Sequence, residues 1–248
     1  MRQALIALLL FVTTGPALTQ TASAQNPLRG AVAQGATSIA WLIETEGVYI
    51  CCCNGQYNTI NIGNDNRNHV EYDEILLIAT LDGGKVTKLK MTEPNCPLKS
   101  GTRLVENVAP DASLDFLLEH VADDKKDRLV AAIAMHDQPR VVPELIQLAR
   151  NHRQTDVRRD AVFWLGQRAG DKAAAELERV IDEDPEDDVR EHAVFAVSQL
   201  PRERAVPILV KLVKTHNRPA VRKRAMFWLA QTGDPRALDL IDEILNTR

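Results

Sequence analysis

The residues best suited to chemistry in this sequence are its four cysteines. Cys51, Cys52 and Cys53 are consecutive, and Cys96 lies in a proline-flanked loop. On a strand Cys51 and Cys53 face one side and Cys52 the other, so we expect Cys96 to form a disulfide with one of the three, without the sequence choosing which. Tetrahedral thiolate metal sites usually space paired cysteines by about two to four residues, so a metal fits this run less well. A thiol-redox role of the Cys51–Cys53 run is the remaining alternative.

Histidines and carboxylates give no comparable signal. The sequence lacks the spacing of a zinc protease, a nucleophile elbow, a phosphate-binding glycine loop and a dinucleotide fingerprint. Two Glu-His pairs occur, ending at His120 and His192, while His152 and His216 fall at equivalent positions in loops. We therefore expect no catalytic constellation, no bound metal and no cofactor.

The cysteines belong to a segment whose pattern is that of β-strands. Runs rich in β-branched and aromatic residues occupy 39–43, 48–53, 57–62, 75–81 and 85–91, and turn residues separate them. Asp82-Gly83-Gly84 between the last two runs is the strongest hairpin signal. We predict a small antiparallel β module of about five strands over residues 38–109, with a flexible lead-in over 25–37 and a domain boundary at Pro110.

The second half of the chain repeats with a period of 32 residues. Segments 157–167, 189–199 and 221–231 align without a gap, and Val, Arg, Ala, Phe and Gln recur in register in all three. Apolar residues at i, i+4, i+7 and i+8 make each segment one face of a helix, and a second apolar run follows it after a turn. A weaker copy at about 125–155 brings the number of helical hairpins to four, and a helix at 111–122 is expected to cap them.

This Val-Arg-x-x-Ala-x-x-x-Leu pattern with a second short helix resembles the HEAT repeat family in its compact bacterial, phycobilisome-lyase-like form, over about residues 125–248. The resemblance implies an α-solenoid and a protein-binding scaffold, and does not imply an activity. The predicted fold is therefore an α+β chain of two domains, the β module followed by a solenoid over 110–248. The exposed second helices suggest Glu176, Arg179, Lys211 and Lys214 as residues that line a groove for the partner.

Two rows of identical residues recur with the period of the repeat. The arginine row consists of Arg158, Arg190 and Arg222, and the glutamine row consists of Gln167, Gln199 and Gln231. Such rows could contact an extended partner. Because they follow the repeat itself, we interpret them as structural, with guanidinium groups bridging to acidic neighbours and amides tying the hairpin turns. Aromatic residues of the first helices, Phe163, Trp164, Phe195, Phe227 and Trp228, are expected to form the core between repeats.

The N-terminus has the pattern of a secretory signal peptide. Arg2 precedes an apolar run that is too short to span a bilayer, and Ala22-Ser23-Ala24 provides small residues for cleavage after Ala24. We expect residues 1–24 to be removed and the chain to be periplasmic or secreted in a bacterium, without a membrane span in the mature form. An oxidising destination favours disulfides.

The charge balance excludes a strongly basic protein. Lys and Arg number 30 against 34 Asp and Glu, a net charge of −4, so we expect no nucleic-acid partner. The predicted function is a non-catalytic scaffold that binds a protein or peptide on its solenoid. An accessory factor or enzyme acting on a tetrapyrrole or metal, by analogy with lyase-like relatives, is the alternative beside the thiol-redox role.

Overall fold

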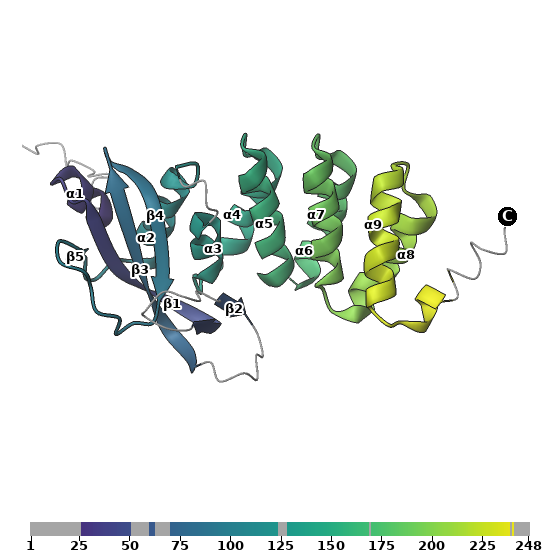
Figure 1. The fold of residues 1–248 in the computed structure, drawn as a ribbon, viewed down its shortest axis with the longest axis horizontal. Helices are drawn as coiled ribbons and strands as arrows, with labels where there is room; N and C mark the ends of the chain where they lie inside the picture. The colour runs from purple at the N-terminus through teal and green to yellow at the C-terminus, as the bar shows by residue number, and fades with distance from the viewer. Residues whose placement is uncertain are drawn as a thin grey trace, which may run out of the picture.

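The computed structural model describes residues 26–50, 60–62, 70–123, 128–168, 170–238 and 240. Figure 1 shows a twisted sheet at one end of an elongated molecule and a row of stacked helices that extends from it. The predicted signal peptide and Cys51, Cys52 and Cys53 lie outside the described residues. Within the described part of the chain, no helix is both long and apolar enough to cross a bilayer.

The sheet has the strand order β2-β1-β3-β4, and β5 pairs with β1. Its strands are β1 (Ser38–Ile50), β2 (Ile60–Ile62), β3 (Val70–Asp82), β4 (Lys85–Thr92) and β5 (Arg103–Leu104). The predicted β3–β4 hairpin is present, and Gly83 and Gly84 at its turn have φ of 55° and 81°, which glycine adopts without strain.

Two features of the sheet differ from the prediction. Residues 46 and 47 do not separate two strands, because β1 continues past them with a register shift between Glu44 and Val48. The sheet is also mixed, since the short β5 runs parallel to β1.

The segment predicted as a flexible lead-in contains a helix, α1 (Pro27–Ala33). Asn26 caps it, because its side-chain oxygen accepts a hydrogen bond from Leu28 N at 3.0 Å. Asn26 Nδ2 also donates to Ala112 O at 2.7 Å, and Leu28 is fully buried. The apolar face of this single short helix was too brief to give a periodic signal, so tertiary packing decides its structure.

Helices α2 to α9 form most of the solenoid in the described residues, and further helical residues follow at 235–238, which confirms the predicted sheet-plus-solenoid class. Their residue ranges are α2 (Pro110–His120), α3 (Arg128–Met135), α4 (Val141–Asn151), α5 (Thr155–Arg168), α6 (Gly170–Glu183), α7 (Asp187–Ser198), α8 (Arg202–Thr215) and α9 (Pro219–Gln231). In Figure 1 the helices of the repeated motif, α5, α7 and α9, stand side by side in front of α4, α6 and α8. The helix expected to cap the stack is α2, which lies between the sheet and α3.

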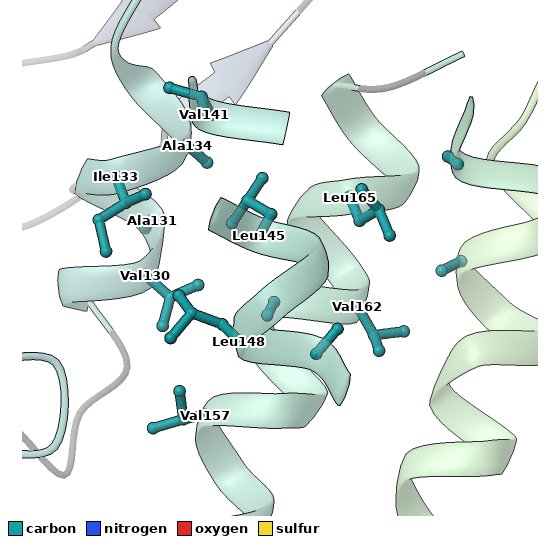
Figure 2. Close-up of a cluster of buried hydrophobic side chains, with 14 of the residues drawn as sticks. Val130, Ala131, Ile133, Ala134, Val141, Leu145, Leu148, Val157, Val162 and Leu165 are labelled. Atoms are coloured by element: carbon teal, nitrogen blue, oxygen red, sulfur yellow. The ribbon is translucent and has the colours of Figure 1, made fainter. Parts of the chain in front are cut away.

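Packing between the two layers of helices is uneven. Each second helix packs most closely on the motif helix of the next unit, as α4 does on α5, α6 on α7 and α8 on α9. The closest helix pairs are therefore not the hairpins predicted from the sequence, in which each motif helix was paired with the helix after it. Figure 2 shows the buried contact of the first pair, where Leu145 and Leu148 of α4 lie beside Val162 and Leu165 of α5.

The motif helices also touch one another directly. The α5–α7 and α7–α9 contacts are extensive, whereas α4, α6 and α8 make few contacts among themselves. The motif helices α5, α7 and α9 therefore form the more closely packed layer of the solenoid, and the surface that they present is named the inner face.

One apolar core joins the sheet to the solenoid. Trp41 of β1 is fully buried, and its ring lies edge-on to Phe116 of α2, with ring centroids 5.6 Å apart. The same cluster of buried side chains continues from Leu28 in α1 to Leu240. The β module, marginal by itself at about 70 residues, is therefore stabilised by the helices on which it packs.

Candidate functional site

The inner face displays a row of aromatic side chains at equivalent positions of successive repeats. The aromatic row consists of Phe163 and Trp164 on α5, Phe195 on α7, and Phe227 and Trp228 on α9. Phe163 and Phe195 are stacked, with centroids 6.2 Å apart and planes 11° apart, and Phe195 and Trp228 follow at 4.8 Å. The 32-residue repeat therefore places rings from three helices in mutual contact along the solenoid axis.

These rings lie at the edge of the core, and the prediction that they form the core between repeats is wrong in part. Trp164 and Trp228 are half-buried against the core, Phe163 and Phe195 are also half-buried, and Phe227 is 51% exposed. The buried face of each motif helix is made by small and aliphatic residues, such as Ala161 in α5. At Gly166 the backbones of α5 and α7 approach so closely that an added Cβ would lie 3.0 Å from Ala196 Cβ. A large ring has no room there and turns to the flank.

Beside the aromatic row lies a hollow of about 460 Å³, and its lining residues are Arg159, Asp188, Glu191, His192, Phe195, Arg224 and Trp228. Arg224 Nε donates to Glu191 Oε2 at 2.9 Å across the α7–α9 contact. Burial lowers the pKa of His192, and the positive charges of Arg159 and Arg224 lower it further. The hollow thus combines aromatic walls with paired charges and a neutral imidazole.

Trp228, one of the lining residues of this hollow, has a hydrogen-bond donor that is unpaired in the described part of the chain. Its Nε1 atom is shielded from solvent and has no partner among the described residues. A buried indole N–H usually finds an acceptor, because leaving it unpaired costs about 1–3 kcal/mol.

The arginine row has a different environment. Arg158 and Arg190 are buried, and in each repeat the guanidinium donates to carbonyls of the preceding loop, as Arg158 Nη1 does to His152 O at 3.0 Å and Arg222 Nη1 to His216 O at 2.7 Å. Arg158 also binds both carboxylate oxygens of Asp184, at 2.9 and 3.2 Å. These are the contacts of residues that hold the loops between repeats.

The glutamine row lies at the ends of the motif helices. Gln199 and Gln231 are exposed, and Gln199 Nε2 donates to Ser198 Oγ at 3.1 Å. For Gln167 and Gln231 no hydrogen bond to a turn is found within the described residues. The expected role of the amides in tying the turns therefore has no support in these contacts.

The four predicted groove residues lie in the other layer of helices. Glu176 and Arg179 are on α6, where Glu176 lies 3.8 Å from Arg150 and Arg179 Nε donates to Glu183 at 2.9 Å. Lys211 on α8 pairs with Glu178 at 2.5 Å, and Lys214 is exposed. The structure thus places them on α6 and α8, whereas the helices that supply the hollow and the aromatic row are α5, α7 and α9, and their predicted role in binding stays a prediction.

Cys96 is buried against the sheet, where it packs on Ala40 of β1 and Leu76 of β3. Ile50 at the end of β1 lies ten residues beyond Ala40, a span of about 30 Å in a strand. A disulfide holds its Cα atoms about 4–7 Å apart, so a bond between Cys96 and the Cys51–Cys53 run requires that run to return along the sheet. The predicted pairing lies outside the described residues and stays a prediction.

A serine–histidine pair occurs where the sheet meets the solenoid, and sequence reasoning missed it. Ser113 Oγ lies 2.8 Å from His136 Nε2 and accepts a hydrogen bond from Trp41 Nε1 at 2.7 Å, while His136 Nδ1 lies 2.8 Å from Ala132 O. A carbonyl can only accept, so Nδ1 carries the proton and Nε2 accepts from the serine hydroxyl. Both side chains are about 1% exposed and the histidine has no carboxylate partner among the described residues, so the pair as described lacks the access and orientation of a nucleophile and its base.

The geometry of a metal centre is also not found in the described residues, where no group of three or more His, Cys, Asp and Glu side chains converges. Of the two Glu-His pairs, Glu119 bonds to Arg29 and His120 to Asp123. A search of curated proteins finds no match to the chain. Comparison with known families matches residues 110–198 and 176–248 to HEAT repeats, which together cover more than half of the chain. With the two-layered stack of helices and the recurrent motif, this match shows that the chain belongs to the HEAT repeat family.

Proposed function

We propose that this protein is a non-catalytic scaffold, exported to the periplasm or the cell exterior, that binds a protein or peptide on the inner face of its solenoid. HEAT repeats are commonly protein-interaction scaffolds, and their solenoids are typically non-catalytic. The observation that supports the inner face is the partly exposed aromatic row beside a hollow with an unpaired indole N–H.

The chemistry of this face suggests what a partner must offer. Aromatic residues are enriched at the centres of protein interfaces, where they give a large contact area at a small entropy cost. An apolar side chain of the partner would fill the hollow between Phe195 and Trp228. The Arg224–Glu191 pair at the edge would contribute orientation more than affinity, because exposed ion pairs are worth about 0–1 kcal/mol.

The proposed location rests on the signal-like N-terminus, and it makes envelope proteins the expected partners. The α6 and α8 surface with Glu176, Arg179, Lys211 and Lys214 is the second face on which a partner could bind, because Arg179 and Lys211 place positive side chains at equivalent positions of successive units.

Affinity capture with the chain from Gln25 onward tests the proposal and distinguishes the two faces. Phe227→Asp alters the inner face, and Leu238→Asp is the matched control, because both side chains are exposed, by 51% and 66%. A third variant reverses the charges of Lys211 and Lys214. All three are compared with the unaltered chain, using envelope extract and equal amounts of folded bait.

The expected result is a saturable protein partner that the Phe227→Asp bait loses and the Leu238→Asp bait retains. Loss of the partner only in the Lys211/Lys214 variant would move the binding site to the α6–α8 surface. Capture of nothing by the unaltered chain under gentle conditions would contradict the scaffold proposal.

A further inference from the structure

One edge of β1 is open between its two short neighbours. β5 pairs with β1 at Ile39 and Ala40, and β2 pairs with it at 48–50. Val105 N donates to Ala40 O at 2.8 Å, so the peptide groups of Ala40 point toward this edge. Since alternate residues of a strand point the same way, the peptide groups of Leu42 and Glu44 also face it.

These peptide groups are largely unpaired. Glu44 O accepts from Asp137 N at 3.1 Å, whereas the N–H and C=O of Leu42 and the N–H of Glu44 have no backbone partner on this side within the described residues. The chain does not continue the pairing after Val105, because Asn107 turns it away with a φ of 54° in the left-handed region. An exposed strand edge of this kind is a template for another strand.

The open edge forms one wall of a hollow of about 510 Å³, called here the edge slot. Its other walls are the 104–110 segment and the loop between α3 and α4, which contributes His136 and Gln138. Leu42 and Leu104 line it and are 40% and 47% exposed, which makes them two of the four exposed large apolar side chains in the described residues. The slot therefore offers apolar contacts beside unpaired backbone groups.

The charged side chains that line the edge slot are all negative in the described residues. Glu44, Glu74 and Glu106 line it, and no lysine or arginine does so among the described residues. Three carboxylates without a cation favour a positively charged ligand. Leu42 lies on the same face of β1 as Glu44, so the aliphatic stems of Lys or Arg side chains would cover the leucine, whereas the residues between them face the side of Ile43 and favour apolar side chains.

We propose that the edge slot binds an extended basic peptide segment, with Lys or Arg alternating with apolar residues, which adds to β1 as a strand. Its backbone hydrogen bonds with Leu42 and Glu44 supply the recognition of an extended chain, and the carboxylates select positive side chains. Side chains of an added strand alternate between its faces, so the charged ones lie on one side and the apolar ones on the other. This site lies on the β module, and it does not depend on the inner face of the solenoid.

Fluorescence anisotropy with a fluorescein-labelled Lys-Val-Lys-Val-Lys peptide tests the proposal on the chain from Gln25 onward. Two control peptides separate the contributions: Glu-Val-Glu-Val-Glu reverses the charge, and the lysine peptide N-methylated at every internal amide cannot donate backbone hydrogen bonds to β1. The protein variant is Glu44→Gln with Glu106→Gln, matched by Glu186→Gln with Glu203→Gln, which removes two exposed carboxylates from the solenoid.

The lysine peptide is expected to bind saturably, and the Glu44/Glu106 variant to bind it about threefold to tenfold more weakly, as the loss of two exposed charge pairs implies. Hydrogen exchange should show that the peptide protects the amides of Leu42 and Glu44. Absence of saturable binding at millimolar peptide would overturn the proposal, and so would equal affinity for the N-methylated peptide, which would indicate charge attraction alone. The Phe227→Asp chain should bind the peptide unchanged, so failure of one proposal leaves the other standing.

Discussion

His136 makes the stability of this protein depend on pH in a predictable direction. Burial lowers the pKa of His136 to about 4, because the charged imidazole would lose its hydration in the core, and Arg168 adds a smaller repulsion. The neutral ring is satisfied by Ser113 and by the carbonyl of Ala132. In the unfolded chain the same imidazole has a pKa of about 6.5, so acid favours the unfolded state.

The magnitude follows from the two pKa values. Above pH 6.5 the imidazole is neutral in both states and has no effect on the free energy of unfolding. As the pH falls from 6.5 toward 4, the unfolded chain binds a proton that the folded chain excludes, and stability declines. With a folded pKa of about 4, the loss attributable to His136 is about 2 kcal/mol at pH 5 and about 3 kcal/mol at pH 4.

Urea unfolding followed by tryptophan fluorescence, at pH 7 and at pH 5, measures this loss. His136→Gln removes the titrating group and is expected to reduce the difference between the two pH values by about 2 kcal/mol. Its overall destabilisation does not matter, because the comparison is made within each variant. His192→Gln is the matched control, since His192 is less buried and should contribute less. An unchanged pH dependence in His136→Gln would refute the reasoning.

Four other substitutions test the packing of the solenoid. Gly166→Ala should destabilise the protein by about 1–3 kcal/mol, because the added Cβ would lie 3.0 Å from Ala196 Cβ and the α5 and α7 backbones would have to move apart; an unchanged melting temperature would contradict that close approach. Arg158→Met leaves the buried carboxylate of Asp184 without its guanidinium and should cost about 3–5 kcal/mol at pH 7, measured by urea unfolding, whereas a cost below about 1 kcal/mol would show that Asp184 reaches solvent. Phe116→Ala should cost about 3–5 kcal/mol and Phe227→Ala less than about 1 kcal/mol in the same assay, and equal losses would place the second ring in the core.

The solenoid could be predicted from the sequence because each repeat carries its own helical pattern of apolar residues. Val157, Ala161 and Leu165 recur with helical spacing, and the copies at Val189 and Val221 agree with them. Which helices pack most closely could not be predicted in this way. A motif helix is preceded and followed by another helix in the chain. Its apolar periodicity predicts that one face is buried, but not which of the two helices packs on that face.

The aromatic row shows a second limit of the pattern. Phe163, Phe195 and Phe227 recur as regularly as the buried alanines, so recurrence does not separate a core residue from a surface one. The close approach of the motif helices at Gly166 decides the matter, because it leaves space between the backbones only for small side chains. Such a distance between helices is a property of the assembled layers and cannot be read from one helix.

The contacts between the sheet and the solenoid could not be predicted from the sequence either, because their hydrogen bonds join residues far apart in the chain. Trp41, Ser113 and His136 come from β1, α2 and the end of α3, and each completes the bonding of the next. Separating the halves would break the Trp41–Ser113 hydrogen bond and expose the apolar surfaces that Trp41 and Phe116 bury against each other. The two halves, distinct in composition, therefore depend on each other for stability, and a partner that binds either half acts on one folding unit.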